Sequence, residues 1–223
     1  MKDMLLIKQG NIHDAVQRNA YIGDILVENG KIVKMEPVLQ GKTINDAQVL
    51  DASGLQIYPG FVEAHCHLGL NGYAIGFEGA DYNEMTDSLT PQLSAIDALN
   101  PQDESIHLAM EGGVTCVAAG PGSSNVLGGT FAVYKTVGKR IDDMIIKEKA
   151  GMKCAFGENP KRCYKDKEIY SRMSTASKLR IMLEKTKEYL LKKETAGEDI
   201  WKRPTYDPKL EALIPVIKGE LPL

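Results

Sequence analysis

The sequence predicts an α/β protein in which a small β domain precedes the opening strands and helices of a (β/α)₈ barrel. Short apolar runs crowd the first part of the chain, and the step Pro59-Gly60 then changes its character. Beyond this step, strand-like and helix-like segments alternate, a pattern that favours βαβ units with parallel strands. We therefore expect a small β domain over residues 1–58 and a barrel portion over residues 59–223.

The β domain is predicted from a series of apolar runs that have the length of strands. These runs cover residues 4–8, 24–28, 31–35, 49–52 and 55–58. Asn29-Gly30 joins the second run to the third, and this pair suits a type I′ hairpin turn because both central residues need positive φ. We expect residues 4–36 to form a β meander and the last two runs to extend the same sheet, in a small, sandwich-like domain.

The barrel portion begins with a predicted strand, Phe61–His65, that ends on histidine. Two more core strands are expected over residues 114–119 and 152–156, because both runs are apolar and the first is rich in β-branched residues. Residues 129–146 lie between them and are expected to form a hairpin inserted between barrel units.

Three helices are expected in the same portion. Asn100-Pro101 has the residue types of a helix start, with Asn as N-cap and Pro in the first turn, and Gly112-Gly113 suits the end of that helix. Apolar residues recur at helical spacing over residues 174–195, and Asp207-Pro208 is expected to open a last helix that runs to about Lys218. A whole barrel takes about 250 residues, so we expect an incomplete, truncated barrel with about three strands and helices.

Composition argues against several classes of protein. The chain has 223 residues and a net charge of −3, which disfavours nucleic-acid and anionic-membrane partners. No apolar stretch approaches the roughly 20 residues of a membrane span, and the first ten residues do not resemble a signal peptide. The four cysteines lack C-x-x-C spacing, so we expect free thiols in a reduced, cytoplasmic protein. The basic cluster at residues 161–167 is expected to be a solvated loop.

The motif His65-Cys66-His67 follows a predicted strand directly. Residues two apart in an extended segment point to the same side, so both imidazoles can reach one metal ion. Alternation directs Cys66 to the opposite face, where we expect a buried thiol rather than a metal ligand. The other two histidines, His13 and His107, do not lie at strand ends.

The segment Tyr58-Pro-Gly-Phe-Val-Glu-Ala-His-Cys-His-Leu68 resembles the signature of the amidohydrolase superfamily, a group of metal-dependent hydrolases. Gly112-Gly-Val-Thr115 and the preceding β domain fit the same pattern, and Gly157–Lys161 is similar to a segment of imidazolonepropionase-like members. Where the family usually has Asp before the histidine pair, this sequence has Glu63. The resemblance runs along the whole chain but covers only the N-terminal part of the family pattern.

The resemblance implies a metal site and a hydrolytic activity. His65 and His67 would be metal ligands from the first barrel strand, and Glu158 matches the position where deacetylase-like members supply a carboxylate. Such a site would hold one or two divalent ions, with Zn²⁺ the first choice and Fe²⁺ or Mn²⁺ as alternatives. The later ligands and the general base of the family have no counterpart up to Leu223, so the catalytic base is expected beyond this chain.

The glycine-rich loop after the second barrel strand is a candidate for substrate contact. Ser123, Ser124 and Asn125 are its polar residues, and Gly128-Gly129 follows them. The loop lacks the spacing and the lysine of a P-loop. Nucleotide binding there is a third, weaker hypothesis. The roles of Glu63, Asp81 and Asp97 stay open at this stage.

The leading hypothesis is therefore a metal-dependent hydrolase that opens a C–N bond in a small amide or cyclic amide, with this chain inactive by itself. The alternative is a non-catalytic amidohydrolase-like scaffold or assembly protein. An incomplete barrel exposes strand edges and apolar faces, so we expect a homo-oligomer or association through those edges. The sequence does not identify the substrate, because barrel specificity comes from loops after all eight strands.

Overall fold

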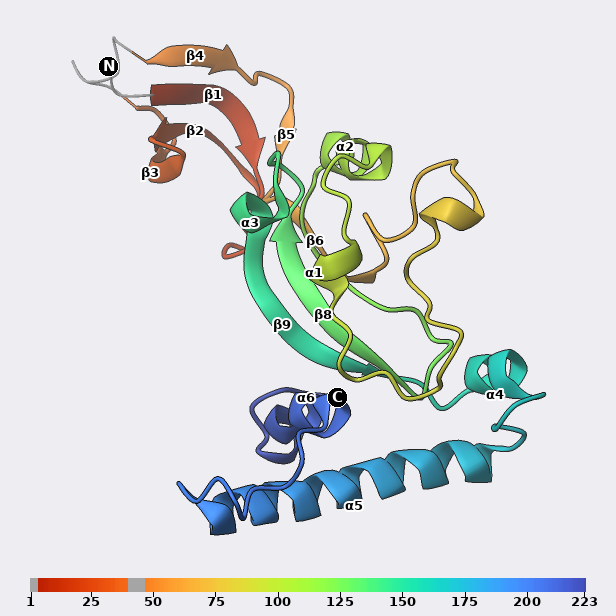
Figure 1. Ribbon diagram of the computed structural model, residues 1–223. Coiled ribbons are helices and arrows are strands. Elements are labelled where there is room, and N and C mark those ends of the chain that lie inside the picture. Colours follow the sequence, from red (N-terminus) through yellow and green to blue (C-terminus); the bar gives the residue numbers. More distant parts are fainter. Residues whose placement is uncertain (1–3, 40–46) are drawn as a thin grey trace. The chain divides into compact units, whose positions relative to one another are not determined.

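The computed structural model describes residues 4–39 and 47–223, and the chain divides into two compact units, Met1–Gly60 and Phe61–Leu223. Each unit contains its own β-sheet, and all helices among the described residues belong to the second unit (Figure 1). The α/β class expected from the sequence is confirmed.

The first unit contains one five-stranded sheet in the order β3-β2-β1-β4, with β5 also paired to β1. Its strands are β1 (Met4–Ile12), β2 (Tyr21–Glu28), β3 (Lys31–Glu36), β4 (Gln48–Asp51) and β5 (Gln56–Ile57). The first three pair antiparallel, as a meander requires, whereas β4 and β5 pair parallel with β1. The predicted meander over residues 4–36 and the extension of the same sheet by the last two runs are thus confirmed, with these last two strands parallel to β1. Among the described residues one sheet stands where a sandwich-like arrangement was expected.

Two local features fix the shape of this sheet. Asn29 and Gly30 have φ of 50° and 74°, so the predicted hairpin turn with two positive φ values is confirmed. The buried carboxylate of Asp24 accepts hydrogen bonds from the backbone N–H groups of Gln9 and Leu39. These hydrogen bonds provide partners for the buried Asp24 carboxylate and connect β2 to β1 and to the segment that follows β3.

The second unit contains a four-stranded sheet in the order β6-β7-β8-β9. Its strands are β6 (Phe61–Cys66), β7 (Val114–Ala119), β8 (Leu127–Lys135) and β9 (Ile145–Cys154). The first two pair parallel, as expected for neighbouring barrel strands, but β8 pairs antiparallel with both β7 and β9. The predicted hairpin is therefore part of the sheet itself. Its first arm, β8, stands between β7 and β9. Most of the residues expected for its second arm form a short helix at 141–144, and β9 itself ends in the run that was expected as the next core strand. A series of parallel barrel strands is therefore not confirmed.

Short helices connect β6 to β7 and β8 to β9. They are η2 (Phe77–Gly79), α1 (Ala95–Ala98), α2 (Glu104–Glu111) and α3 (Ile141–Met144). The helix expected at Asn100-Pro101 begins later, because Asp103 is the N-cap and accepts a hydrogen bond from the backbone of Ser105. It ends at Gly112, as predicted.

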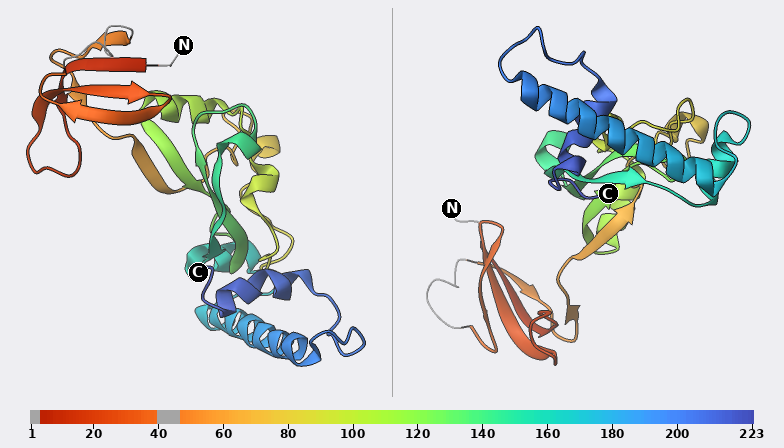
Figure 2. Two further views of the ribbon diagram at one scale, coloured as in Figure 1. Left: turned by 90° about the vertical axis from the view of Figure 1, so that its left-hand side faces the viewer. Right: turned by 90° about the horizontal axis from the view of Figure 1, so that it is seen from below.

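Three helices follow β9: α4 (Glu158–Tyr164), α5 (Arg172–Ala196) and α6 (Pro208–Ile217). The two long helices were predicted, whereas α4 replaces the turn and the solvated basic loop that were expected there. Helix α6 lies between α5 and the ends of β8 and β9 (Figures 1 and 2). The apolar cluster that joins these elements contains Leu127, Met152, Met182, Leu213 and Leu221. Within the described residues, no helix combines the length and the apolar character that a membrane crossing requires.

Candidate metal centre and adjoining pockets

His67 follows the end of β6 and is held in a defined orientation. Its Nδ1 lies 2.7 Å from the backbone carbonyl oxygen of Gly120, just beyond the end of β7. A carbonyl can only accept, so Nδ1 carries the proton and Nε2 keeps the lone pair that a metal would use. The ring of Tyr82 stacks on the imidazole, with centroids 5.1 Å apart. The backbone carbonyl and the aromatic ring together fix both the tautomer and the plane of this imidazole.

His65 has different surroundings. Its ring contacts Phe131, with centroids 4.9 Å apart, and its Nε2 lies 3.5 Å from the Nζ of Lys153. Partial burial, then the Lys153 cation and His67, lower the pKa of His65, while Glu63 acts in the opposite direction. The environment therefore favours the neutral imidazole, which is the form that binds metals.

Lys153 was not identified from the sequence. It lies on β9 between the buried Met152 and Cys154, and burial lowers the pKa of its ammonium group. A lysine within the otherwise apolar run over residues 152–156 was the only available signal. Phe131, which contacts His65, can lie close to the backbone beyond the end of β7 only because residue 120 is glycine: a Cβ there would lie 2.4 Å from the ring of Phe131.

Cys66 points away from the two imidazoles, as the alternation of the strand predicted. Its Sγ lies 3.7 Å from the carbonyl oxygen of Ala118, and the side chain packs against the core cluster around Val117 and Tyr134. Burial raises the pKa of the Cys66 thiol, which disfavours the thiolate that a zinc ligand must be. All four cysteines of the chain are free.

Glu158 does not join the histidine pair. It is the first residue of α4, and its exposed carboxylate forms ion pairs with Lys161 at 3.0 Å and Arg172 at 3.1 Å. Hydrogen bonds from these two cations lower the pKa of Glu158. The chain turns into a helix after β9 instead of continuing the strand, and this turn directs the carboxylate toward α5.

The histidine pair supplies two ligands rather than a complete metal site. The ring centroids of His65 and His67 are 6.0 Å apart. Two imidazoles that share a tetrahedral zinc ion would have ring centres about 5 Å apart, since each Zn–N bond is about 2 Å long, so a small side-chain rotation suffices. In the part of the chain that the structure describes, no group of three or more His, Cys, Asp or Glu side chains is placed to hold a metal.

A pocket of about 250 Å³ adjoins His67, and we call it the His67 pocket. Its lining residues are His67, Tyr82, Asn83, Gly122, Ser123, Ser124, Asn159, Arg162 and Cys163. The predicted substrate residues Ser123 and Ser124 thus lie in its wall. Asn125 does not line the pocket: it is buried, and its amide nitrogen lies within hydrogen-bond distance of Asp87 O, Thr90 Oγ1 and Tyr164 Oη.

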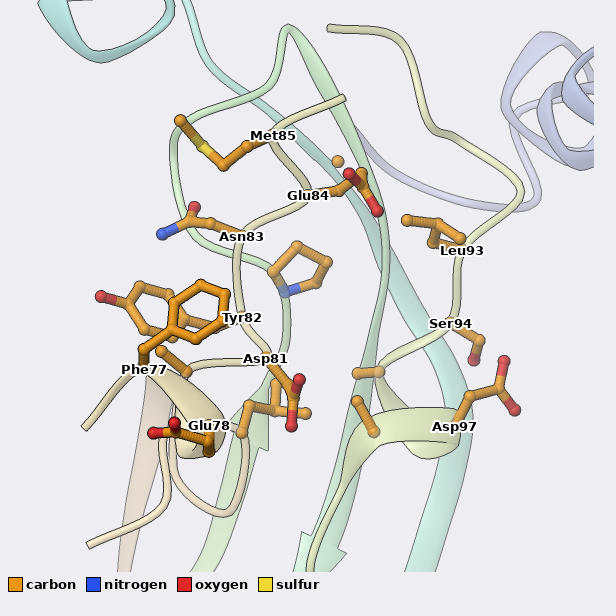
Figure 3. A pocket seen from close by; sticks show the side chains of 16 residues that line it. Phe77, Glu78, Asp81, Tyr82, Asn83, Glu84, Met85, Leu93, Ser94 and Asp97 are labelled. Carbon is orange, nitrogen blue, oxygen red and sulfur yellow. The ribbon is translucent and has the colours of Figure 1, made fainter. Parts of the chain in front are cut away.

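A larger pocket of about 500 Å³ shares Tyr82 and Asn83 with the first, and we call it the acidic pocket. Figure 3 shows the segment from Asp81 to Met85 along one wall, with Leu93, Ser94 and Asp97 along the other. Four carboxylates line it: Glu78, Asp81, Glu84 and Asp97. Asp81 and Asp97, whose roles the sequence left open, therefore belong to one pocket, but no imidazole lines that pocket. The candidate ligand His67 lines only the smaller one.

The fold has a close relative among solved structures. An amidohydrolase from Thermotoga maritima superposes with a TM-score of 0.90 at 38% sequence identity, over 98% of this chain and 56% of that chain. No protein-family model matches this sequence.

Two curated proteins match parts of the sequence. An amidohydrolase of Hapsidospora irregularis, tasK, is 34% identical over 157 residues, which are 65% of this chain and 16% of that protein. A dihydroorotase of Elusimicrobium minutum is 29% identical over 178 residues, 70% of this chain and 39% of that protein. This chain therefore spans well under two thirds of the length of each of these relatives. The shared fold, the histidine pair at the end of β6 and these matches place the chain in the amidohydrolase superfamily.

Proposed function

We propose that this chain forms part of the active site of a metal-dependent hydrolase that cleaves a C–N bond in an amide or cyclic amide. The observation that carries the proposal is the pair His65 and His67 at the end of β6, with Nε2 of His67 left for a metal by the bond from Nδ1 to Gly120. The relatives named amidohydrolase and dihydroorotase support hydrolysis of such bonds. Superfamily members are typically metal-dependent, and the imidazole pair suits that chemistry.

In this proposal the residues of the chain have separate tasks. A divalent ion, Zn²⁺ first and Fe²⁺ or Mn²⁺ as alternatives, supplies an acidified water and polarises the scissile carbonyl when bound. His67 gives a rigid ligand because Gly120 and Tyr82 hold its ring. His65 gives a neutral ligand, and the ammonium of Lys153 moves aside from Nε2 to admit the ion.

Further ligands have to complete the site. We propose that they come, with the general base, from segments that the longer relatives have in addition to the part matched here. The carboxylate of Glu158 forms ion pairs with Lys161 and Arg172. Glu158 is therefore a candidate ligand only if these ion pairs break.

A zinc titration of the metal-free chain, with binding measured by isothermal titration calorimetry, tests the proposal. Weak binding of one ion is expected, because two imidazoles make an incomplete site. His65→Ala and His67→Ala should each abolish it, whereas His107→Ala, an exposed helix histidine, should leave it unchanged. Zinc binding that is absent, or equal in all three variants, would remove the metal function.

One observation favours assembly as a second candidate function. Strand β6 stands at the end of the sheet order, and its Phe61 and Val62 side chains are 57% and 67% exposed. Exposed apolar strands at a sheet edge tend to pair with another chain. We propose that β6 associates with a second copy of this chain.

Sedimentation velocity tests this association. The unmodified chain is expected to dimerise at micromolar concentration, and Val62→Asp should shift it to the monomer by placing a charge on the edge. Val137→Asp is the control, since Val137 is 66% exposed but lies outside the strands. A monomer at all concentrations would argue against the scaffold function.

A further inference from the structure

The His67 pocket has a cationic side chain in its wall, Arg162, from the last turn of α4. Its Nη2 donates to the Oδ1 of Asn159 at 3.2 Å, and among the described residues it forms no ion pair. The nearby carboxylate of Glu158 is bound by Lys161 and Arg172 instead. The guanidinium group of Arg162 therefore retains donors and a full positive charge at the pocket wall.

The rest of the pocket wall suits a small polar ligand. Ser123 and the amides of Asn83 and Asn159 provide short polar groups, and no acidic side chain lines this pocket. A volume of about 250 Å³ admits only a small molecule. A ligand held by Arg162 in so small a space would lie next to His67, the proposed metal ligand whose ring contacts Gly120 and Tyr82.

We propose that Arg162 is a specificity-determining residue that binds an anionic group of the substrate, so that the substrate class is a small amide bearing a carboxylate or phosphate. Guanidinium groups bind both anions through paired, charge-assisted hydrogen bonds. This inference rests on the proposed function, because it places the amide of the same molecule beside the metal ligands.

Binding measurements on the metal-free 223-residue chain test the inference without requiring activity. The probes are N-acetylglycine, N-acetyl-O-phosphoethanolamine and the neutral N-acetylglycinamide, each titrated at low ionic strength and followed by NMR. An anionic probe should bind about tenfold more tightly than the neutral one, in line with a hydrogen bond to a charged group. The anionic probe that binds more tightly shows whether the substrate's anionic group is a carboxylate or a phosphate.

Two variants separate a specific site from general attraction. Arg162→Gln should abolish the preference for anions, and Arg162→Lys should retain part of it because the charge remains without the paired donors. Arg172→Gln, an exposed arginine of the same region that pairs with Glu158, should leave the preference intact. Equal binding of all probes, no detectable binding, or a preference that survives Arg162→Gln would each overturn the inference.

The outcome is independent of the metal proposal. The anion preference should persist in His65→Ala, because His65 does not line the pocket. If zinc binding fails while this preference stands, the metal function is wrong and the anion site is retained. If zinc binds while the preference is absent, only the anion site is wrong.

Discussion

The His67 pocket and the acidic pocket share Tyr82 and Asn83 but differ in size and charge. The acidic pocket has about twice the volume and is lined by four carboxylates, whereas the smaller one contains His67 and Arg162. One short segment of chain thus separates a pocket lined by carboxylates from a pocket lined by an arginine and no carboxylate. The comparison teaches that charge and donor type, rather than volume, identify the candidate site.

The largest expected effect concerns Asn125, which is buried and directly follows the pocket-lining residues Ser123 and Ser124. Asn125→Ala should lower the free energy of unfolding by about 3 kcal/mol, since it removes the buried hydrogen bonds of the Asn125 amide. The amide nitrogen lies within hydrogen-bond distance of Asp87 O, Thr90 Oγ1 and Tyr164 Oη. Urea denaturation measures the loss. The control is Ser123→Ala at a pocket-lining residue, which should change the free energy of unfolding by no more than about 0.5 kcal/mol. Equal losses of unfolding free energy in both variants would show that the two residues do not differ in structural role.

Gly122 lines the His67 pocket and contacts Tyr82, one of the two residues that both pockets share. A Cβ on Gly122 would lie 2.3 Å from Asn83 Oδ1 and 2.8 Å from the ring of Tyr82. Gly122→Ala should therefore cost about 1–2 kcal/mol of unfolding free energy and shift NMR signals around both pockets. Gly157→Ala is the control, because nothing lies within 4 Å of its added Cβ. Unchanged signals in one pocket would show that the wall is not shared.

The neutral state of His65 gives a smaller, pH-dependent effect. Its pKa lies below the ordinary value of 6.5, so the unfolded chain binds more protons in the interval between the two values. The contribution of His65 to the unfolding free energy should therefore rise with pH across that interval. An NMR titration of the metal-free chain should show that Lys153→Met raises the pKa of His65. Lys149→Met on the same strand should not, and a pKa at or above 6.5 in the unmodified chain would contradict the assignment.

The smallest effect is expected in the acidic pocket. Asp81→Asn removes one of four like charges and should stabilise the fold by a few tenths of a kcal/mol at low salt, with the gain lost at high salt. Asp166→Asn, an exposed carboxylate that does not line this pocket, is the control. Thermal denaturation at two salt concentrations measures both, and a gain independent of salt would exclude repulsion as its cause.

Local signals predicted much of the fold. Asn29-Gly30 indicated its hairpin, Asp207-Pro208 indicated the start of α6, and apolar residues at helical spacing indicated α5, because turn, capping and periodicity signals are local. The pairing of β4 with β1, and of β8 with both β7 and β9, could not be predicted in this way. These contacts join segments far apart in the chain, and an apolar run does not specify its partner.

The candidate site was predicted in the same uneven way. The spacing of His65 and His67 on a strand indicated their shared side, whereas the placement of Glu158 depended on a helix start that the sequence did not reveal. Lys153 and Arg162 were missed because each acquires its role only from contacts across the fold. A lysine within a strand and an arginine within a basic cluster are, by residue type alone, solvent-facing.

The position of β6 in its sheet has a consequence for folding order. Strands β8 and β9 are joined by a short connection, whereas β6 meets β7 through contacts such as that of Cys66 with Ala118, 52 residues apart in the chain. Closing the longer loop costs more chain entropy, so the hairpin should form first and β6 should join late. The strand that carries His65 should therefore also open first, and its amides should exchange hydrogen for deuterium sooner than those of β8.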